Sequence, residues 1–228
     1  MKHIGIVGIT AEGTALCYKT IVAQSARLVG QNIHPEISIN NISFDQILAL
    51  QKAKSWSGVA KLMCSSIQKL SSIGTEVAII PANSIHYAIE EILRISPIPV
   101  LNLVDLVANE CITRGFKKIA ILGVGITMSD GLYERSLMNV GVETITPSVE
   151  VQSELNDIIY NEIVPGIYTE ETTQKIVNIL DGLRSSGCDS VILGCTELPI
   201  LITEANSSLP FIDTTRLLAI KSLDYALS

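Results

Sequence analysis

Short runs of β-branched residues alternate along this chain with longer stretches in which apolar residues recur every three to four positions. The short runs are typical of buried strands, and the longer period is typical of amphipathic helices. This alternation predicts βαβ units, in which helices cover both faces of a parallel sheet. The expected strands are residues 4–7, 36–40, 77–81, 100–102, 119–122, 142–145, 191–193 and 211–212. The expected helices are residues 13–29, 55–71, 86–95, 103–114, 131–139, 153–162, 170–185 and 214–226.

An internal repeat divides the chain into two similar halves. Three segments recur in the same order, and the pairs begin at Gly74 and Gly187, Lys2 and Lys117, and Pro99 and Pro210, with offsets of 113, 115 and 111. A period of this length is too long for a solenoid. We therefore predict an α/β fold of two similar Rossmann-like domains, each with a parallel four-stranded sheet. The expected domains are residues 1–98 plus 211–228, and residues 99–210.

Two like halves imply a pseudo-two-fold axis and a cleft between the domains. In open parallel sheets, ligands bind beyond the carboxyl ends of the strands, where helix N-termini present free N–H groups. Four turns are expected at those ends, at residues 8–14, 81–84, 123–129 and 194–197. Their hydroxyls, small residues and N–H groups suit a small anionic molecule better than a bulky apolar one.

Composition narrows the class of protein further. The chain has 228 residues, of which 47% are hydrophobic and 17% charged, so it can bury a sizeable core. The net charge is −7 and no cluster of basic residues occurs, which argues against a nucleic-acid partner. No apolar run reaches the roughly 18 residues of a spanning helix, and no leader segment is evident, so we expect a cytoplasmic protein without a membrane partner.

Neither a metal site nor a nucleotide site is indicated by the motifs. The five cysteines include no CxxC pair and no Cys/His cluster, so neither a disulfide framework nor a structural zinc site is expected. The phosphate-binding patterns GxGxxG and GxxxxGK[ST] are also missing. We therefore expect no cofactor, and we expect packing roles for Cys17, Cys64, Cys111 and Cys188.

Cys195 is the leading candidate for chemistry. It follows an apolar strand and precedes an expected helix start, where N–H groups and the helix dipole would stabilise a thiolate. The alternative is a buried thiol that only packs. Glu197 would act either as a base or as a carboxylate that neutralises the helix N-terminus. His86 would be either a proton donor or a structural residue.

At residues 80–86, 123–129 and 193–199 the chain resembles the aspartate/glutamate racemase family, and the Leu-Gly-Cys-Thr-Glu-Leu stretch at 193–198 is the most specific part. The resemblance implies two α/β domains, no cofactor, a homodimer, and an amino acid bound between the domains. It also implies a pair of cysteines on opposite faces of the α-carbon, one of which removes the proton while the other returns one. The substrate-binding positions that it implies are Thr10, Asn83, Ser84, Thr127, Met128, Thr196 and Glu197.

The chain departs from the family pattern at the first cysteine. Where members usually read Pro-Cys-Asn-Thr, this chain has Ala82 between Pro81 and Asn83, and a methyl group cannot carry a proton. Three accounts stay open: an engineered Cys→Ala change, a natural homologue with one cysteine, or a paralogue that binds without catalysing. Smaller departures are Leu218, where many members have His, and the lack of a basic residue between Arg135 and Lys175.

These observations lead to three hypotheses of function. The first is a cofactor-independent amino-acid racemase of the aspartate/glutamate type, with Cys195 as the retained acid/base and Ala82 at the missing partner. The second is a one-cysteine decarboxylase or isomerase of the same superfamily, because decarboxylation forms the carbanion without a base. The third is a catalytically silent protein that binds a small carboxylate. An amino acid or dicarboxylate is the expected small-molecule partner in all three.

Overall fold

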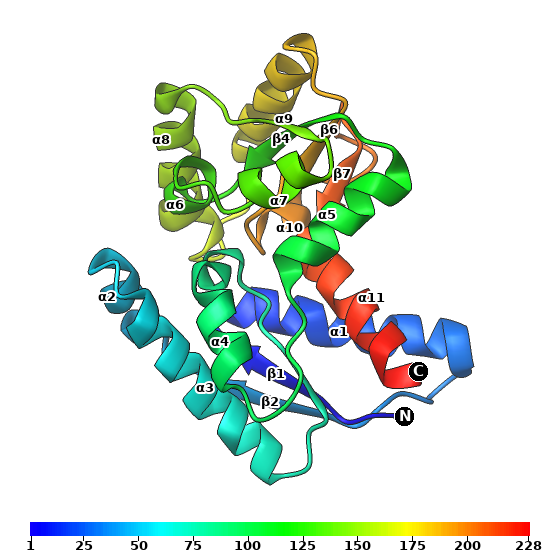
Figure 1. The fold of residues 1–228 in the computed structure, drawn as a ribbon. Helices are drawn as coiled ribbons and strands as arrows, with labels where there is room; N and C mark the ends of the chain where they lie inside the picture. Colours follow the sequence, from blue (N-terminus) through cyan, green and yellow to red (C-terminus); the bar gives the residue numbers. More distant parts are fainter. The chain divides into compact units, whose positions relative to one another are not determined.

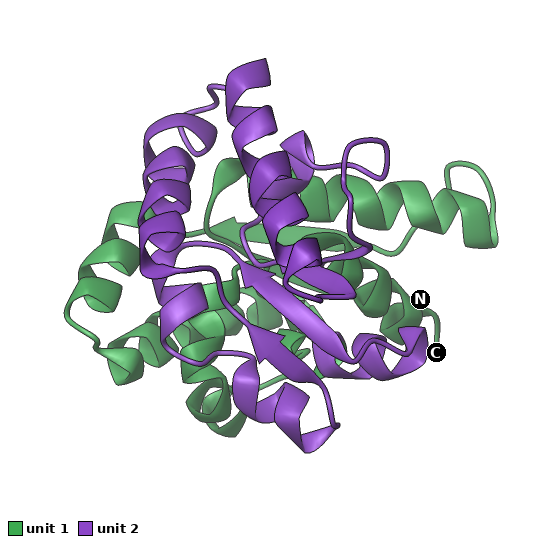
Figure 2. Cartoon of the chain, turned by 90° about the horizontal axis from the view of Figure 1, so that it is seen from above, with its two compact units in different colours: residues 1–106, 215–228 green, residues 107–214 purple.

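The structure of the chain, a computed structural model, describes residues 1–228 and divides them into two compact units. The first unit comprises residues 1–106 and 215–228, and the second comprises residues 107–214, as coloured in Figure 2. The repeat in the sequence placed the boundaries at 98/99 and 210/211, and the structure places them at 106/107 and 214/215. Two segments cross them, α5 (Leu103–Arg114) and α11 (Thr214–Leu227).

A parallel sheet in the order β2-β1-β3 forms the centre of the first unit (Figure 1). Its strands are β1 (Ile4–Gly8), β2 (Ile37–Asn41) and β3 (Val77–Ile79). Its helical segments are α1 (Ala11–Val29), α2 (Phe44–Lys52), α3 (Trp56–Ser72), the 3₁₀ turn η1 (Asn83–Ala88) and α4 (Ile89–Ile95). The expected strand at 100–102 is reduced to one parallel bridge between Val100 and Ala78, so this sheet has three strands and not the expected four.

The second unit repeats this topology with a complete fourth strand, in the order β5-β4-β6-β7. Its strands are β4 (Lys118–Leu122), β5 (Glu143–Ile145), β6 (Ser190–Leu193) and β7 (Phe211–Asp213). Its helical segments are α6 (Gly125–Ser129), α7 (Glu134–Asn139), α8 (Val149–Ile158), the π-helical turn η2 (Ile159–Ile163), α9 (Glu170–Ser185) and α10 (Leu198–Leu201). The fold class expected from the repeat, two α/β units with parallel sheets, is confirmed.

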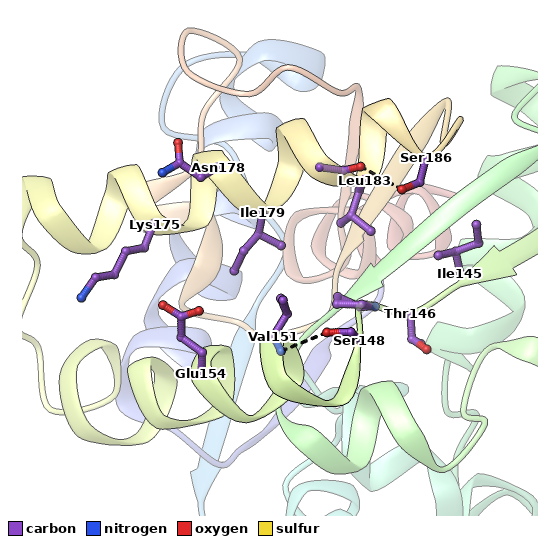
Figure 3. Close-up of a pocket in the computed structure, with 12 residues that line it drawn as sticks. Ile145, Thr146, Ser148, Val151, Glu154, Lys175, Asn178, Ile179, Leu183 and Ser186 are labelled. Carbon is purple, nitrogen blue, oxygen red and sulfur yellow. Dashed lines mark hydrogen bonds between the residues drawn. The ribbon is translucent and has the colours of Figure 1, made fainter.

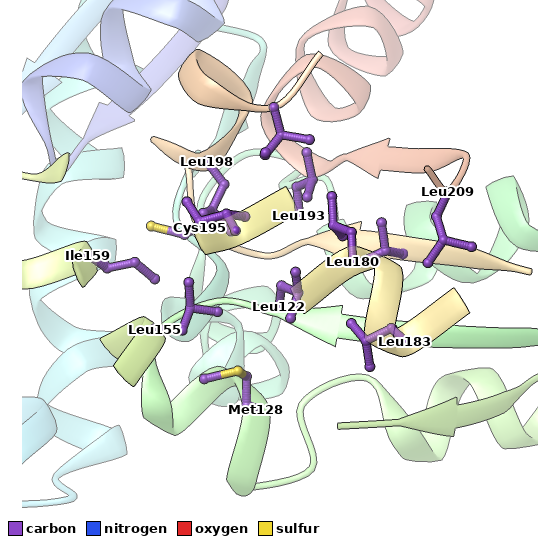
Figure 4. Packing of buried hydrophobic residues seen from close by; sticks show 14 of the residues in the cluster. Leu122, Met128, Leu155, Ile159, Leu180, Leu183, Leu193, Cys195, Leu198 and Leu209 are labelled. Atoms are coloured by element: carbon purple, nitrogen blue, oxygen red, sulfur yellow. The ribbon is translucent and has the colours of Figure 1, made fainter. Parts of the chain in front are cut away.

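Each unit has its own apolar core, as alternation of buried strands and amphipathic helices requires. In the first unit, the inward faces of α3 and α4 pack on β1 and β3, with Met63, Ile67 and Ile80 fully buried. In the second, α8, η2 and α9 pack against β4 and β6, with Leu155, Leu180 and Leu193 fully buried (Figure 4). None of the helices is both long and apolar enough to cross a membrane.

Candidate functional site

The turn that follows β6 carries Cys195, Thr196 and Glu197. All three side chains lie almost entirely inside the protein, with exposed fractions of 6%, 6% and 2%. Four consecutive buried residues of β6 fix the start of this turn, and the short helix α10, with Pro199 in its first turn, closes it. Figure 4 shows the Cys195 sulfur at the edge of the apolar cluster, on the side of Ile159.

Two glycines allow the ends of β4 and β6 to approach closely beneath this turn. The Gly194 N–H donates a 2.6 Å hydrogen bond to the carbonyl of Leu122. A Cβ atom at Gly194 would lie 2.9 Å from that carbonyl oxygen, and one at Gly123 would lie 2.9 Å from the carbonyl oxygen of Gly194. Real Cβ atoms do not approach backbone this closely, so glycine is needed at both positions for steric reasons.

Cys195 is paired with a buried carboxylate. Its Sγ donates a hydrogen bond to Glu197 Oε2 over 3.1 Å, and the Thr196 hydroxyl donates to the same oxygen over 2.6 Å. Burial, followed by the charge of Glu197, raises the pKa of the Cys195 thiol well above its ordinary value. The resting site therefore holds a protonated thiol against a carboxylate.

This corrects the expectation that a helix N-terminus would stabilise a thiolate at Cys195. Helix α10 begins three residues later, at Leu198, and contains four residues. The N–H groups of Glu197 and Leu198 at this helix start do lower the pKa of Cys195, but loss of water and the neighbouring carboxylate outweigh them, because both disfavour a second negative charge. Glu197, expected at a helix start, does immediately precede α10, and its carboxylate faces back towards Cys195 and Thr196.

The turn after β4 supplies a second hydroxyl to the same part of the second unit. Thr127 is fully buried, and its methyl carbon lies 3.1 Å from where a Cβ at Gly194 would stand. Its hydroxyl oxygen is buried without a hydrogen-bond partner, which is uncommon for a polar group. Met128, by contrast, packs its side chain into the apolar cluster with Leu155 (Figure 4), so its role there is packing.

In the first unit, the turn after β3 brings together the residues around position 82. Ala82 is extended and immediately precedes η1, which begins at Asn83. The Gln51 side-chain amide donates to the Ser84 hydroxyl over 2.8 Å and so joins α2 to this turn. Sequence reasoning missed Gln51, because no pattern predicted helix α2, which carries it.

His86 anchors this turn from behind. The His86 ring is 3% exposed, and its Nδ1 lies 3.0 Å from the Ala82 carbonyl oxygen. Burial lowers the pKa of His86 to about 4, although nearby carbonyl groups and Asp105 act in the opposite direction. At neutral pH the imidazole is uncharged, so it is not a ready proton donor, and the structural interpretation of His86 is the better supported one.

The N-terminal turn places Thr10 at the start of α1, where its hydroxyl accepts a hydrogen bond from the Gly13 N–H over 3.3 Å. A threonine in this position satisfies one of the free N–H groups of a helix start. The remaining four cysteines, Cys17, Cys64, Cys111 and Cys188, are buried free thiols, as the packing interpretation predicted.

A cavity of about 490 Å³ lies elsewhere in the second unit, between α8 and α9 (Figure 3). Val151, Ile179 and Leu183 form its apolar side. Its one cationic group, the Lys175 ammonium, is already paired with Glu171 over 3.0 Å, and no cysteine or histidine lines it. The cavity therefore lacks a thiol of the kind that the Cys195 turn provides.

Comparison with solved structures defines the class of protein. An aspartate racemase homologue from Pyrococcus horikoshii superposes with a TM-score of 0.87 at 31% sequence identity, over 100% of both chains. The shared architecture is the two-unit α/β fold of the amino-acid racemases.

Sequence comparison gives the family. A sequence model of the Asp/Glu/hydantoin racemase family matches residues 6–221, and the chain belongs to this family. A broad-specificity amino-acid racemase of Bacillus subtilis is 28% identical over 159 residues, which is 70% of this chain and 68% of the relative. A glutamate racemase of Aquifex aeolicus is 28% identical over 68% of this chain and 59% of its own length. These matches support an isomerase of the amino-acid racemase type.

Proposed function

We propose that this protein exchanges the α-proton of an acidic amino acid, aspartate or glutamate, without a cofactor, and that Cys195 is its acid/base. The observation that carries the proposal is the buried hydrogen bond between the Cys195 thiol and the Glu197 carboxylate. A group that returns a proton to carbon must hold that proton at rest, and the raised pKa of Cys195 keeps it there.

Glu197 also allows Cys195 to act in the opposite direction, as the base that removes the α-proton. Transfer of the thiol proton to Glu197 gives a thiolate and a carboxylic acid, so the pair carries one negative charge before and after the step. Burial therefore does not penalise the transfer as it would penalise loss of the proton to solvent. The thiolate then takes the α-proton and becomes a thiol again, and the electron pair of the C–H bond stays on the substrate as an enediolate.

The substrate carboxylate has to accept this charge. Hydroxyl and N–H donors held in place before the reaction stabilise such an anion, because they need no reorganisation. The Thr127 hydroxyl, buried without a partner, is a donor of this kind. Asn83, Ser84 and Thr196 are further proposed substrate contacts, from the resemblance to the family, and Thr10 is proposed on the same ground.

Position 82 decides how complete the reaction is. Inversion requires a proton carrier on each face of the α-carbon, and the family resemblance assigns one face to position 82, where this chain has a methyl group. We therefore expect the chain to exchange the α-proton of one enantiomer, and full racemisation to be slow or one-directional.

The test is proton NMR of L- and D-aspartate and L- and D-glutamate in deuterated buffer. The chain, its Ala82→Cys variant and its Cys195→Ala variant are compared side by side. We expect the chain to remove the α-proton signal of one enantiomer and Ala82→Cys to remove the signals of both. With Cys195→Ala neither signal should be lost. The proposal fails if neither the chain nor Ala82→Cys exchanges any of the four substrates, or if Cys195→Ala still exchanges them.

A one-cysteine decarboxylase is the second candidate, and one specific observation favours it: a single protonated thiol without a cysteine at position 82. Release of carbon dioxide from a malonate-type diacid leaves a carbanion that needs one proton donor and no base. Turnover of such diacids by the chain, with amino acids inert, would establish this reaction instead. Tight binding of small carboxylates without any turnover would indicate the silent binding protein.

The proposal includes a homodimer in the cytoplasm. The dimer is proposed from the family resemblance, and five buried free thiols are what a protein of a reducing compartment carries. Light scattering tests the dimer, since the protomer mass is 24.6 kDa. Fractionation of cells tests the location.

A further inference from the structure

A π-helical turn brings a tyrosine to the Cys195 turn. Helix α8 ends at Ile158, and the next five residues, Ile159–Ile163, form the turn η2. Here the Val164 N–H donates to the Ile159 carbonyl, five residues back, over 2.9 Å. π-helical turns are rare in proteins and are often found at functional sites. Tyr160 lies in this turn, which ends the helical segment before residues 164–166.

Packing fixes which way the segment faces. Ile159 and Ile163 belong to the same apolar cluster as Cys195 and Leu198, and Figure 4 shows the Cys195 sulfur on the side of Ile159. One helical turn before Tyr160, Asn156 accepts a hydrogen bond from the Gly125 N–H over 2.9 Å. Tyr160 follows Asn156 by four residues, about one turn of the segment, which directs it towards the side that contacts the turn after β4.

The Tyr160 phenol is half-buried. Burial, followed by the negative charges that Cys195, once ionised, and Glu197 carry, raises the pKa of Tyr160. The phenol therefore stays neutral through the physiological range and keeps its O–H as a donor. A tyrosine that only packs would not need this hydroxyl, and phenylalanine would fill the same space.

We propose that Tyr160 is a substrate-contacting residue, whose O–H donates to a carboxylate oxygen of the ligand next to Cys195. This extends the proposed function, on which it rests for the identity of the ligand. The phenol must keep its proton in this position, because a phenolate would add to the negative charges that the Cys195 and Glu197 pair and a carboxylate ligand bring together. The hydrogen bond strengthens as the substrate carboxylate takes up charge, and Tyr160 thereby favours the transition state over the bound substrate.

A pair of thiol reagents tests Tyr160 without relying on racemase activity. Iodoacetate and iodoacetamide both alkylate a cysteine, but only iodoacetate carries a carboxylate for Tyr160 to bind. The rate of alkylation at Cys195 is measured for both by peptide mass analysis, in the chain, in Tyr160→Phe and in Tyr18→Phe. Tyr18, on α1 of the first unit and 40% exposed, is the matched control for loss of a phenol hydroxyl.

The expected result is a roughly tenfold lower rate with iodoacetate in Tyr160→Phe, with the iodoacetamide rate, the unfolding temperature and the control variant unchanged. An unchanged ratio of the two rates overturns the proposal. So does a failure of both reagents to reach Cys195 in the chain, because no carboxylate ligand could then lie between Cys195 and Tyr160.

Proton exchange separates this proposal from the proposed function. If the amino acids exchange, Tyr160→Phe is expected to lower kcat about a hundredfold with little change in KM. A selective loss of iodoacetate reactivity without exchange by any variant would keep Tyr160 as a carboxylate donor and reject the racemase. Proton exchange by the chain, together with an unchanged ratio of the iodoacetate and iodoacetamide rates in Tyr160→Phe, would support the racemase and reject Tyr160 as a carboxylate donor.

Discussion

Replacement of Glu197 by Gln separates the charge of this side chain from its shape. Gln keeps a hydrogen-bonding oxygen near Cys195 Sγ but carries no charge and cannot take up the thiol proton. Two effects of opposite direction follow. Without the carboxylate, the Cys195 thiolate forms at lower pH, and without the internal proton acceptor, α-proton exchange at neutral pH slows.

The magnitude of the first effect comes from the geometry. Unit charges 3.1 Å apart repel by about 5 kcal/mol at an effective dielectric constant of about 20. If a quarter of this repulsion remains after relaxation, the midpoint of Cys195 alkylation against pH falls by about one pH unit. For the second effect, loss of a general base is expected to slow exchange about a hundredfold or more.

The assay follows iodoacetamide alkylation of Cys195 and α-proton exchange across the same pH series, in the chain and in the Ala82→Cys background. Glu162→Gln is the control, because Glu162 lies in the same unit and also accepts a hydrogen bond from a threonine, Thr172. The exchange rate of Glu197→Gln should recover as the pH approaches the thiol midpoint. An alkylation midpoint that stays or rises, or exchange at the original rate at neutral pH, refutes the reasoning.

Three further predictions concern stability and the ligand. In Gly194→Ala the new Cβ would press on the Leu122 carbonyl, so this variant should destabilise the fold by about 2 kcal/mol. Gly182→Ala in α9 has open space around it and should stabilise the fold by up to about 1 kcal/mol. Chemical denaturation measures both changes. His86 is neutral in the folded chain, where its pKa is about 4 against an ordinary value of 6.5. Between these two pH values the unfolded chain binds more protons than the folded chain. The free energy of unfolding therefore falls as the pH drops from 6.5 to 4, by about 3 kcal/mol in total. The pH dependence should be lost in His86→Gln and kept in the control His34→Gln at an exposed histidine, and an unchanged profile would contradict the assignment. Thr127→Val removes a hydroxyl without a partner, so unfolding should be unaffected while binding of aspartate, measured by calorimetry, weakens about tenfold; equal binding would remove Thr127 from the site.

Much of the fold was determined by the sequence alone. The alternation of strands and helices and the repeat at offsets near 113 predicted two α/β units, and the three strands of the first sheet follow the same order as the corresponding three strands of the second. Helices α5 and α9 were predicted with their observed bounds, because their apolar period is uninterrupted and clear end signals flank it. The strand expected at 100–102 forms only a bridge, since strand length depends on pairing, which local sequence does not contain.

The sequence also singled out Cys195, because a cysteine in a polar turn after a buried strand is recognisable locally. Its protonation state was decided by tertiary structure. The local sequence left a stabilised thiolate and a buried thiol both open, whereas burial and the distance to Glu197, both products of packing, favour the thiol. Tyr160 and Gln51 escaped prediction for the same reason: a π-helical turn and an inter-helix hydrogen bond leave no periodic signal in the chain. Periodicity records which residues are buried, but the chemistry of a buried group depends on the neighbours that folding brings to it.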